Sequence, residues 1–349
     1  MRRLRLSVRT SARPHRHGHA VLDNLLSDGY DVTVLVRRQE AAQELSKSGL
    51  KTVLGTLEDH KIICENTASS DIVIHTATAD DMSSVKAVIE GIRQRSSQDQ
   101  KTIYIHTSGT SFPSDDSQPA FKSDTVYHDN KPEQMYALPD SASHRLIDLE
   151  ILKARAEFGT KALLCIVLPP LIYGVVKKHS KLSIQVPTLT RFALKHKYAA
   201  HIGQGEAVWS TVHVADLARA YLMILHWAES APDSATTGSP YFFCENGEEI
   251  SWGDVAGMIG KDLHSAGKVD AASAKEIPRQ EYVDVFGPYS AVVVGSNSRS
   301  RANRVRELGW SPREKGIREA FEVEELQLLL EETGSFAGYA KPAASGATS

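Results

Sequence analysis

The sequence predicts an α/β fold, a doubly wound parallel sheet with helices on both faces. Strand-like and helix-like segments alternate through the first half of the chain, which is the pattern of such a sheet. The first of these segments, residues 4–38, reads as strand, loop, helix and strand. Two parallel strands joined by a helix are the unit from which dinucleotide-binding sheets are built.

The pattern of this opening unit predicts each of its elements. Residues 4–8, LRLSV, are a short alternating apolar run. Residues 20–30 carry apolar side chains at helical spacing, and Gly29 is a helix stop. Residues 31–36, DVTVLV, are rich in β-branched side chains, which fit a strand buried on both faces.

The next segments keep the alternation of helix and strand. We expect a helix at 39–48, a strand at 51–54, a further helix, a strand at 71–76, a helix at 85–94, a strand from 102, a helix at 144–158 and a strand from 162. Between the last two strands, residues 112–142 hold too many Pro, Asp and Ser residues for a core element, so a long polar segment is expected there.

The pattern loosens past Gly174, where a second, smaller unit is expected. We predict a nucleotide-binding domain at residues 1–174, which part of 205–250 rejoins, and a substrate lobe at 175–332. Ser251 is a plausible N-cap for a helix in this lobe. Residues 333–349 are small and rich in Gly, Pro and Ser, which predicts a disordered tail.

Composition narrows the range of functions. The 349 residues carry a net charge of −3, which gives no general attraction to nucleic acid or to a membrane surface. The longest apolar stretch, 162–176, is broken by two prolines and is too short to span a bilayer. The three cysteines are far apart, so buried reduced thiols and a cytoplasmic location are expected. No CxxC or HExxH spacing indicates a metal.

Several motifs in order along the chain carry a family resemblance. They are Asp71-x-Val73-x-His75-x-Ala77, Pro169-Pro170-Leu171-Ile172-Tyr173-Gly174, Trp209-x-x-Val212-His213-Val214-x-Asp216 and Leu308-Gly309-Trp310-x-Pro312. Together they resemble the extended and atypical short-chain dehydrogenase/reductases, close to the NAD-dependent epimerase/dehydratase group. The resemblance covers about residues 18–320. It implies a Rossmann-like fold, a nicotinamide dinucleotide, and a structural role for His213 and Asp216.

The loop after the first strand departs from that family. The family's loop runs much like TGATGYIGG, and its glycines let the backbone approach the pyrophosphate. Laid against it, this chain matches only at Thr10, Ala12 and Gly18. Either the phosphate loop has been lost, or residues 1 to about 17 come from a misread frame or a wrong exon start, which we favour. A mitochondrial presequence is a third reading, weakened because cleavage would remove the first strand. With this loop, we expect weak cofactor binding.

The resemblance places other cofactor-binding residues along the chain. Arg37 and Arg38 close the second strand, where an arginine suits the 2′-phosphate of NADP and an acid suits NAD. We therefore expect NADP, with NAD as the alternative; two solvated arginines are the competing interpretation. The resemblance also assigns contacts with the cofactor to Asp59, His75, Ala77, Pro169 and Tyr173.

The catalytic residues differ most from the family pattern. Ser108, at the end of the strand that begins at 102, occupies the family's catalytic Ser/Thr position. The family's Tyr-x-x-x-Lys is replaced by His144 and Asp148, one helical turn apart. Such a pair is a credible acid–base unit, because the carboxylate can orient the imidazole. A polar helix start without a catalytic role is the equally weighted alternative.

These residues imply an NAD(P)-dependent oxidoreductase of epimerase/dehydratase type, acting on a carbonyl or alcohol of a small molecule. The alternative is a non-catalytic dinucleotide sensor on the same fold, like the NmrA-type regulators. The expected partner is the small-molecule substrate, and a homodimer is compatible with the sequence. Trp209, Tyr198, His201 and Phe192 near the expected cleft predict a partly apolar ligand.

Overall fold

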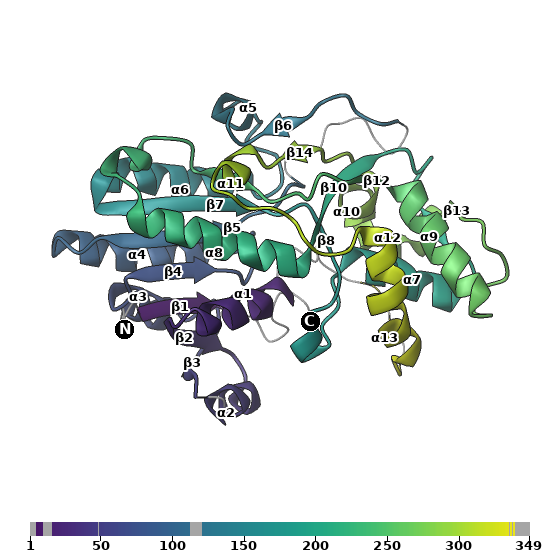
Figure 1. The fold of residues 1–349 in the computed structure, drawn as a ribbon, viewed down its shortest axis with the longest axis horizontal. Helices are drawn as coiled ribbons and strands as arrows, with labels where there is room; N and C mark the ends of the chain where they lie inside the picture. The colour runs from purple at the N-terminus through teal and green to yellow at the C-terminus, as the bar shows by residue number, and fades with distance from the viewer. Residues whose placement is uncertain are drawn as a thin grey trace.

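Seven parallel strands form the central sheet of the computed structural model (Figure 1). The structure describes residues 5–9, 16–47, 49–111 and 121–334, with 336 and 338. In spatial order the strands are β11 (Tyr241–Phe243), β7 (Ala162–Leu168), β5 (Thr102–Thr107), β4 (Ile72–His75), β1 (Arg5–Arg9), β2 (Asp31–Val36) and β3 (Lys51–Leu54). The order reverses between β1 and β4, which is the switch point where doubly wound sheets bind ligands. The predicted fold class is confirmed.

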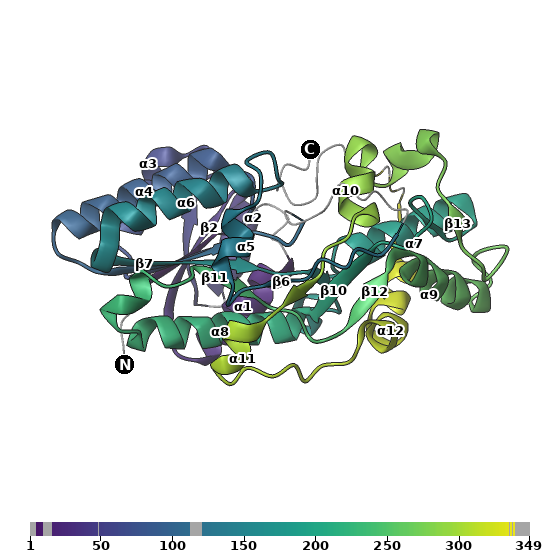
Figure 2. The same ribbon diagram turned by 90° about the horizontal axis from the view of Figure 1, so that it is seen from above.

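Helices cover both faces of this sheet (Figure 2). On one face lie α1 (Arg16–Ser27), α8 (Val214–Ser230) and α11 (Asn303–Glu307). On the other lie α3 (His60–Ala68), α4 (Met82–Ser97) and α6 (Arg145–Phe158), while α2 (Gln39–Lys47) packs on the edge strands β2 and β3. The central strands β4 and β7 are buried along their whole length, as their continuous apolar runs predict, whereas the edge strand β3 is partly exposed.

The expected polar segment at 112–142 contains more structure than its composition indicates. Residues 112–120 lie outside the described part, but β6 (Tyr127–His128) and α5 (Pro132–Tyr136) follow, and Met135 is fully buried. Asp129 explains this order, because its buried carboxylate accepts backbone N–H groups of Phe243, Asn303 and Arg304. One tertiary anchor therefore overrides the local turn signals.

The second half of the chain builds a lobe with its own apolar core beside the sheet domain. The strand β10 (Val208–His213) lies between β8 (Leu171–Tyr173) and β12 (Glu249–Ser251). The other elements are β9 (Ala200–His201) paired with β13 (Lys275–Glu276), β14 (Ser300–Arg301) paired with β6, and the helices α7 (Gln185–His196), α9 (Trp252–Ser265), α10 (Ser290–Gly295), α12 (Ile317–Ala320) and α13 (Leu326–Glu331), with a π-helical turn at Phe321–Glu325. Short 3-10 turns occupy Gly159–Lys161, Lys177–His179, Asp233–Thr236, Arg279–Asp284 and Gly287–Tyr289.

Local signals account for several boundaries in this half. Ser251 caps α9 as predicted, accepting the backbone N–H of Asp254 at 3.0 Å. Gly309 adopts φ +93° and turns the chain after α11. Part of 205–250 lies in the sheet domain, since β11 extends the seven-stranded sheet and α8 packs on it. The tail expected at 333–349 lies largely outside the described residues.

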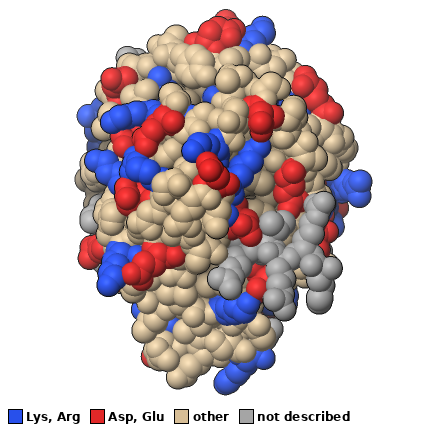
Figure 3. All heavy atoms as spheres, turned by 90° about the vertical axis from the view of Figure 1, so that its left-hand side faces the viewer, with Lys and Arg blue, Asp and Glu red and all other residues tan. Residues whose placement is uncertain are grey.

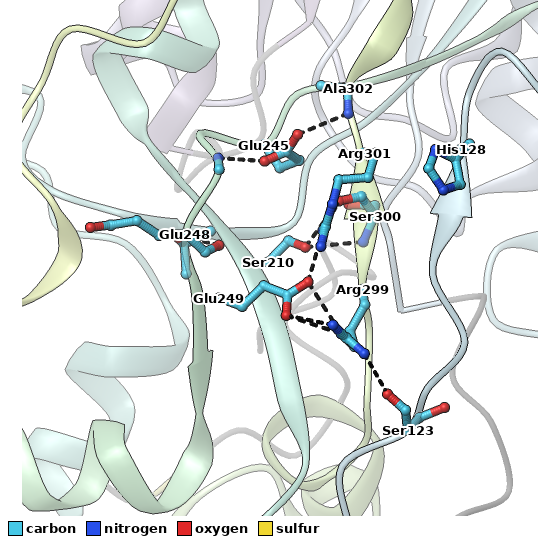
Figure 4. A network of polar contacts seen from close by, with 12 residues as sticks. Ser123, His128, Ser210, Glu245, Glu248, Glu249, Arg299, Ser300, Arg301 and Ala302 are labelled. Atoms are coloured by element: carbon cyan, nitrogen blue, oxygen red, sulfur yellow. Dashed lines mark hydrogen bonds and ion pairs between the residues drawn. The ribbon is translucent and has the colours of Figure 1, made fainter.

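A network of ion pairs joins residues 299–302 to the lobe (Figure 4). The carboxylate of Glu249 lies between Arg299 and Arg301, at 3.0 and 2.7 Å. Arg299 also donates to the carbonyl of Ser123 at 2.8 Å, so the network holds the chain just past 112–120. Ser298, one residue before the network, donates to the carbonyl of Thr110 at 2.5 Å. The lobe thus fixes both ends of the segment that follows β5.

Surface charge gives no sign of a strongly charged partner on the face that Figure 3 displays. Basic and acidic side chains are interspersed there, at the end of the molecule that lies on the left of Figure 1. Mixed charge creates no broad field of one sign. Within the described ranges, no helix is both long enough and apolar enough to cross a membrane.

Candidate functional site

A cavity of about 150 Å³ lies where the carboxyl ends of β4, β5 and β7 meet the lobe. Ligands bind at this edge in doubly wound sheets. The sheet domain contributes the turns that follow these strands, and the lobe contributes mainly apolar side chains. The lining residues are His17, Thr76, Thr78, Ala79, Thr107, Ser108, Gly109, Thr110, Ser111, His144, Pro169, Pro170, Ile172, Ser183, Ile184, Gln185, Trp209 and Val293.

The turn after β5 supplies the hydroxyl groups of the cavity. Its backbone is held against the chain that follows β7, because Ser108 N–H donates to Val167 O at 2.8 Å and Thr110 N–H to Pro169 O at 3.2 Å. Gly109 lets a neighbouring ring pass close by: a Cβ there would lie 3.3 Å from His144 Nε2. The turn therefore brings Ser108 and Ser111 to the cavity beside an imidazole, as the sequence predicts for Ser108.

His144 lies in the cavity wall, but not in the geometry that the sequence predicts. The helix α6 begins at Arg145, and His144 precedes it with φ +64°, in the left-handed region. Its Nδ1 lies 2.5 Å from Asp80 Oδ1, and its Nε2 lies 2.7 Å from Ser111 Oγ. The left-handed backbone costs roughly 1–2 kcal/mol, and such residues are often found at functional sites.

The sequence predicts that Asp148 orients His144, but the hydrogen bonds of His144 go to Asp80 and Ser111. Spacing of four places two residues on one helical face only when both are helical, and His144 is not. Asp148 is fully buried and accepts the hydroxyl proton of Ser108 at 3.1 Å. Burial raises the pKa of Asp148 to about 7. Asp148 thus lies behind the cavity wall, and Asp80 is the carboxylate that orients His144.

This buried carboxyl predicts a dependence of stability on pH. An unfolded aspartate titrates near ~3.9, so from there to pH 7 the folded chain holds a proton that the unfolded chain has released. Stability contributed by this group therefore falls as the pH rises through that window. Urea titrations measure this effect. Between pH 4 and pH 8, the free energy of unfolding of Asp148→Asn should rise by roughly 2–4 kcal/mol relative to that of the wild type. A constant difference would contradict the burial argument.

Two histidines under the cavity are structural. His75 in β4 and His106 in β5 are fully buried, with their Nδ1 atoms 3.1 Å apart. Tyr104 OH lies 3.1 Å from the same atom of His106, and burial lowers the pKa of His106 to about 3. The ring of His75 contacts His106 and Ser84, and His75 is not among the residues that line the cavity, so its predicted cofactor contact stays a prediction. The loop after it, with Thr76, Thr78 and Ala79, lines the cavity.

The remaining predicted cofactor residues fall into three groups. Thr10 and Ala12 lie outside the described residues, while Gly18 is buried in the first turn of α1, next to His17 in the cavity wall. Arg37 and Arg38 are exposed directly after β2 and do not line the cavity. The others are Asp59, Ala77, Pro169 and Tyr173.

Of these four, only Pro169 lines the cavity. The carboxylate of Asp59 closes its own turn by accepting the Thr56 N–H at 2.5 Å. Tyr173 is buried, does not line the cavity and donates to the Lys315 carbonyl at 2.7 Å, so its predicted cofactor contact stays a prediction. Ala77 is fully buried within the loop after β4.

The sequence analysis did not predict Asp80 and Ser111 as site residues, and it predicted only some of the apolar side chains that line the cavity. Both polar residues stand in turns after parallel strands, the position that favours function, so the signal was present. Trp209 lines the cavity as predicted, whereas Tyr198, His201 and Phe192 do not. No group of three or more His, Cys, Asp or Glu side chains in the described ranges is arranged to hold a metal ion.

Comparison with known proteins gives consistent matches. A model of the NAD-dependent epimerase/dehydratase family matches residues 17–236. Oxidase ucsJ of Acremonium sp is 28% identical over 304 residues, 82% of this chain and 86% of the relative. An uncharacterised protein of Saccharomyces cerevisiae is 26% identical over 310 residues, 86% of this chain and 93% of the relative.

Solved structures share the fold at low sequence identity. The UDP-glucose 4-epimerase of Thermotoga maritima has a TM-score of 0.64 at 16% identity, covering 94% of this chain and all 100% of the epimerase. The dTDP-glucose 4,6-dehydratase of Bacillus anthracis has a TM-score of 0.63 at 12% identity, covering 94% of this chain and 96% of the dehydratase. At these identities the likeness establishes the architecture alone.

Proposed function

The chain belongs to the NAD-dependent epimerase/dehydratase family, and from this membership we propose that it is an NAD(P)-dependent oxidoreductase. It interconverts a carbonyl and an alcohol on a small molecule. One observation carries the proposal: His144 and the two serine hydroxyls meet in the cavity at the carboxyl ends of β4 and β5. A bound nicotinamide supplies or accepts hydride, and an imidazole in hydrogen-bond contact with a hydroxyl supplies or accepts the proton.

The cavity wall favours a neutral, largely apolar substrate. Ile172, Ile184, Trp209 and Val293 form its lobe side, and none of the described residues that line it is a lysine or an arginine. A nucleotide diphosphate would need cationic partners for its phosphates. The solved epimerase and dehydratase act on nucleotide sugars by name. We propose that this chain has a different substrate class.

The described residues fit a nicotinamide dinucleotide at two places. His17 and Thr78 in the cavity wall can flank the nicotinamide end. Arg37 and Arg38, exposed after β2, can hold the 2′-phosphate of NADP through charge-assisted hydrogen bonds. We therefore propose NADP as the preferred cofactor.

This preference predicts a selective loss of affinity. The double replacement Arg37→Ser with Arg38→Ser should weaken NADPH binding by about 10-fold or more and leave NADH binding unchanged, because a hydrogen bond to a charged group contributes about 1.5–3 kcal/mol. Calorimetric titration with both dinucleotides measures this. Lys86→Ser, on an exposed position of α4, is the control for a lost positive charge. Equal weakening of NADPH and NADH would overturn the assignment of the arginines.

Consumption of NADPH with a panel of apolar aldehydes and ketones tests the proposal. The assay uses millimolar cofactor, because the loop after β1 keeps only Gly18 of the family's glycines. The absence of the family's tyrosine and lysine at 144 and 148 favours a non-catalytic dinucleotide sensor as the second candidate. Tight NADPH binding with no turnover on any carbonyl would support that sensor and overturn the enzyme.

A further inference from the structure

We propose that Ser111, His144 and Asp80 form one proton relay, in which Ser111 contacts the reacting oxygen of the substrate and Asp80 positions His144. This assignment rests on the proposed oxidoreductase function and goes beyond it. The family's pattern would give the substrate contact to Ser108 and the partner of His144 to Asp148. The distances connect a different serine and a different carboxylate to the imidazole.

The hydrogen bonds fix the tautomer of His144. An ionised carboxylate only accepts hydrogen bonds, so Asp80 Oδ1, 2.5 Å from Nδ1, requires the proton on that nitrogen. Nε2 then faces Ser111 Oγ at 2.7 Å and can accept from the hydroxyl or, when protonated, donate to it. The imidazole is only 5% exposed, so its two nitrogens are largely shielded from water, while the carboxylate of Asp80 is 27% exposed and reaches the solvent.

Ser111 is better placed than Ser108 to touch the substrate oxygen. Both hydroxyls line the cavity, but Ser108 is already bound to the buried carboxyl of Asp148 at 3.1 Å. Ser111 is partly exposed, and its hydrogen bond to His144 joins it to a group that can exchange a proton. The hydroxyl of Ser111 can therefore exchange its proton with the imidazole of His144. The hydroxyl of Ser108 instead donates to Asp148, a buried carboxyl that does not line the cavity.

The backbone around Asp80 explains how its carboxylate is held. Asp81, the next residue, is the N-cap of α4 and accepts the backbone N–H of Ser84 at 2.7 Å. The N–H of Asp80 itself donates to Thr78 Oγ1 at 3.1 Å, within the loop that lines the cavity. Two turn contacts thus fix the strand-to-helix connection with Asp80 aimed at His144.

We propose one proton-transfer sequence for the direction of reduction. The carbonyl carbon gains the hydride and its oxygen takes the hydroxyl proton of Ser111, so the C=O group becomes an alcohol and the reduced dinucleotide is oxidised. Ser111 Oγ recovers a proton from Nε2 of the imidazolium, which becomes neutral. Asp80 stays ionised throughout and keeps Nδ1 protonated.

The relay is tested first without cofactor or substrate. In the full chain with ¹⁵N-labelled histidine, the Nδ1 proton of His144 should appear as a strongly hydrogen-bonded resonance, assigned by its loss in His144→Gln. Asp80→Asn should weaken or remove this signature, because the strong carboxylate acceptor is gone. Asp81→Asn is the matched control, since asparagine is also a good N-cap. Retention of the signal in Asp80→Asn, or its loss in Asp148→Asn, would overturn the pairing.

Kinetics then test the roles of the two serines. Ser111→Ala and Asp80→Asn should each lower kcat by about 10-fold or more with the KM for NADPH unchanged, because a proton-transfer contact is lost and not a cofactor contact. A larger kcat loss in Ser108→Ala than in Ser111→Ala would overturn the assignment of Ser111. A wild type that turns over no carbonyl would instead refute the proposed function, and the resonance experiment would still decide the His144–Asp80 pairing.

Discussion

Replacing His144 with glutamine is expected to lower kcat by about 10²–10⁴-fold, the usual contribution of a positioned general acid or base. Glutamine is polar and close in length, but its amide does not exchange a proton near neutral pH. The contact that His144 Nε2 makes with Ser111 would lose its proton source while the cavity keeps its shape. Steady-state rates of NADPH consumption with the best carbonyl of the panel measure the effect.

Two further variants separate chemistry from backbone strain. His144 has φ +64°, a conformation that asparagine tolerates better than histidine. His144→Asn should therefore be at least as stable as His144→Gln and equally inactive. His226→Gln breaks an exposed pair with Asp28 outside the cavity and should leave kcat unchanged. A kcat for His144→Gln close to the wild-type value would show that the imidazole plays no part in proton transfer.

Replacing Gly174 with alanine is expected to cost about 3 kcal/mol or more of unfolding free energy. Gly174 has φ +82°, and a Cβ there would lie 2.1 Å from His213 Nε2. The ring cannot move away freely, because Nδ1 of His213 accepts the N–H of Ala215 at 3.2 Å and Nε2 lies 3.0 Å from Glu324. The backbone N–H of Gly174 also donates to the buried Glu325.

The same substitution at a second glycine isolates the steric part. Gly159 has φ +55° and ψ −126° but nothing within 4 Å of its added Cβ, so Gly159→Ala should cost only the backbone strain, roughly 1–3 kcal/mol. Urea titrations of both variants give the comparison. If the two variants lost the same stability, the packing of His213 against Gly174 would contribute nothing.

The fold could be read from the sequence because its evidence is local and repeated. Continuous β-branched runs such as 31–36 are typical of strands covered on both faces. Segments with helical spacing between such strands predict parallel strands joined by crossover helices. The error at 127–136 has the opposite cause. Its order comes from Asp129, whose partners lie more than a hundred residues away, and no local pattern encodes such contacts.

The site was predictable in its location but not in its pairing. Ser108 and His144 do meet at one cavity, since strand ends of a parallel sheet converge. The choice of Asp148 as partner assumed that the helix had already begun at His144. A left-handed residue before the helix turns the ring toward the loop after β4 instead, where Asp80 lies. Helical spacing carries no information about that turn.

Transfer of deuteride is the most direct test of the central claim, that this cavity performs oxidoreductase chemistry with an imidazole in place of the family's tyrosine. The full chain is incubated with an accepted ketone and NADPH deuterated at its transferable position, and the alcohol is analysed by mass spectrometry. We predict one deuterium on the carbinol carbon with the wild type, and almost none with His144→Gln over the same time. Alcohol formed without deuterium, or deuterium transfer that is unchanged in His144→Gln, would contradict the account.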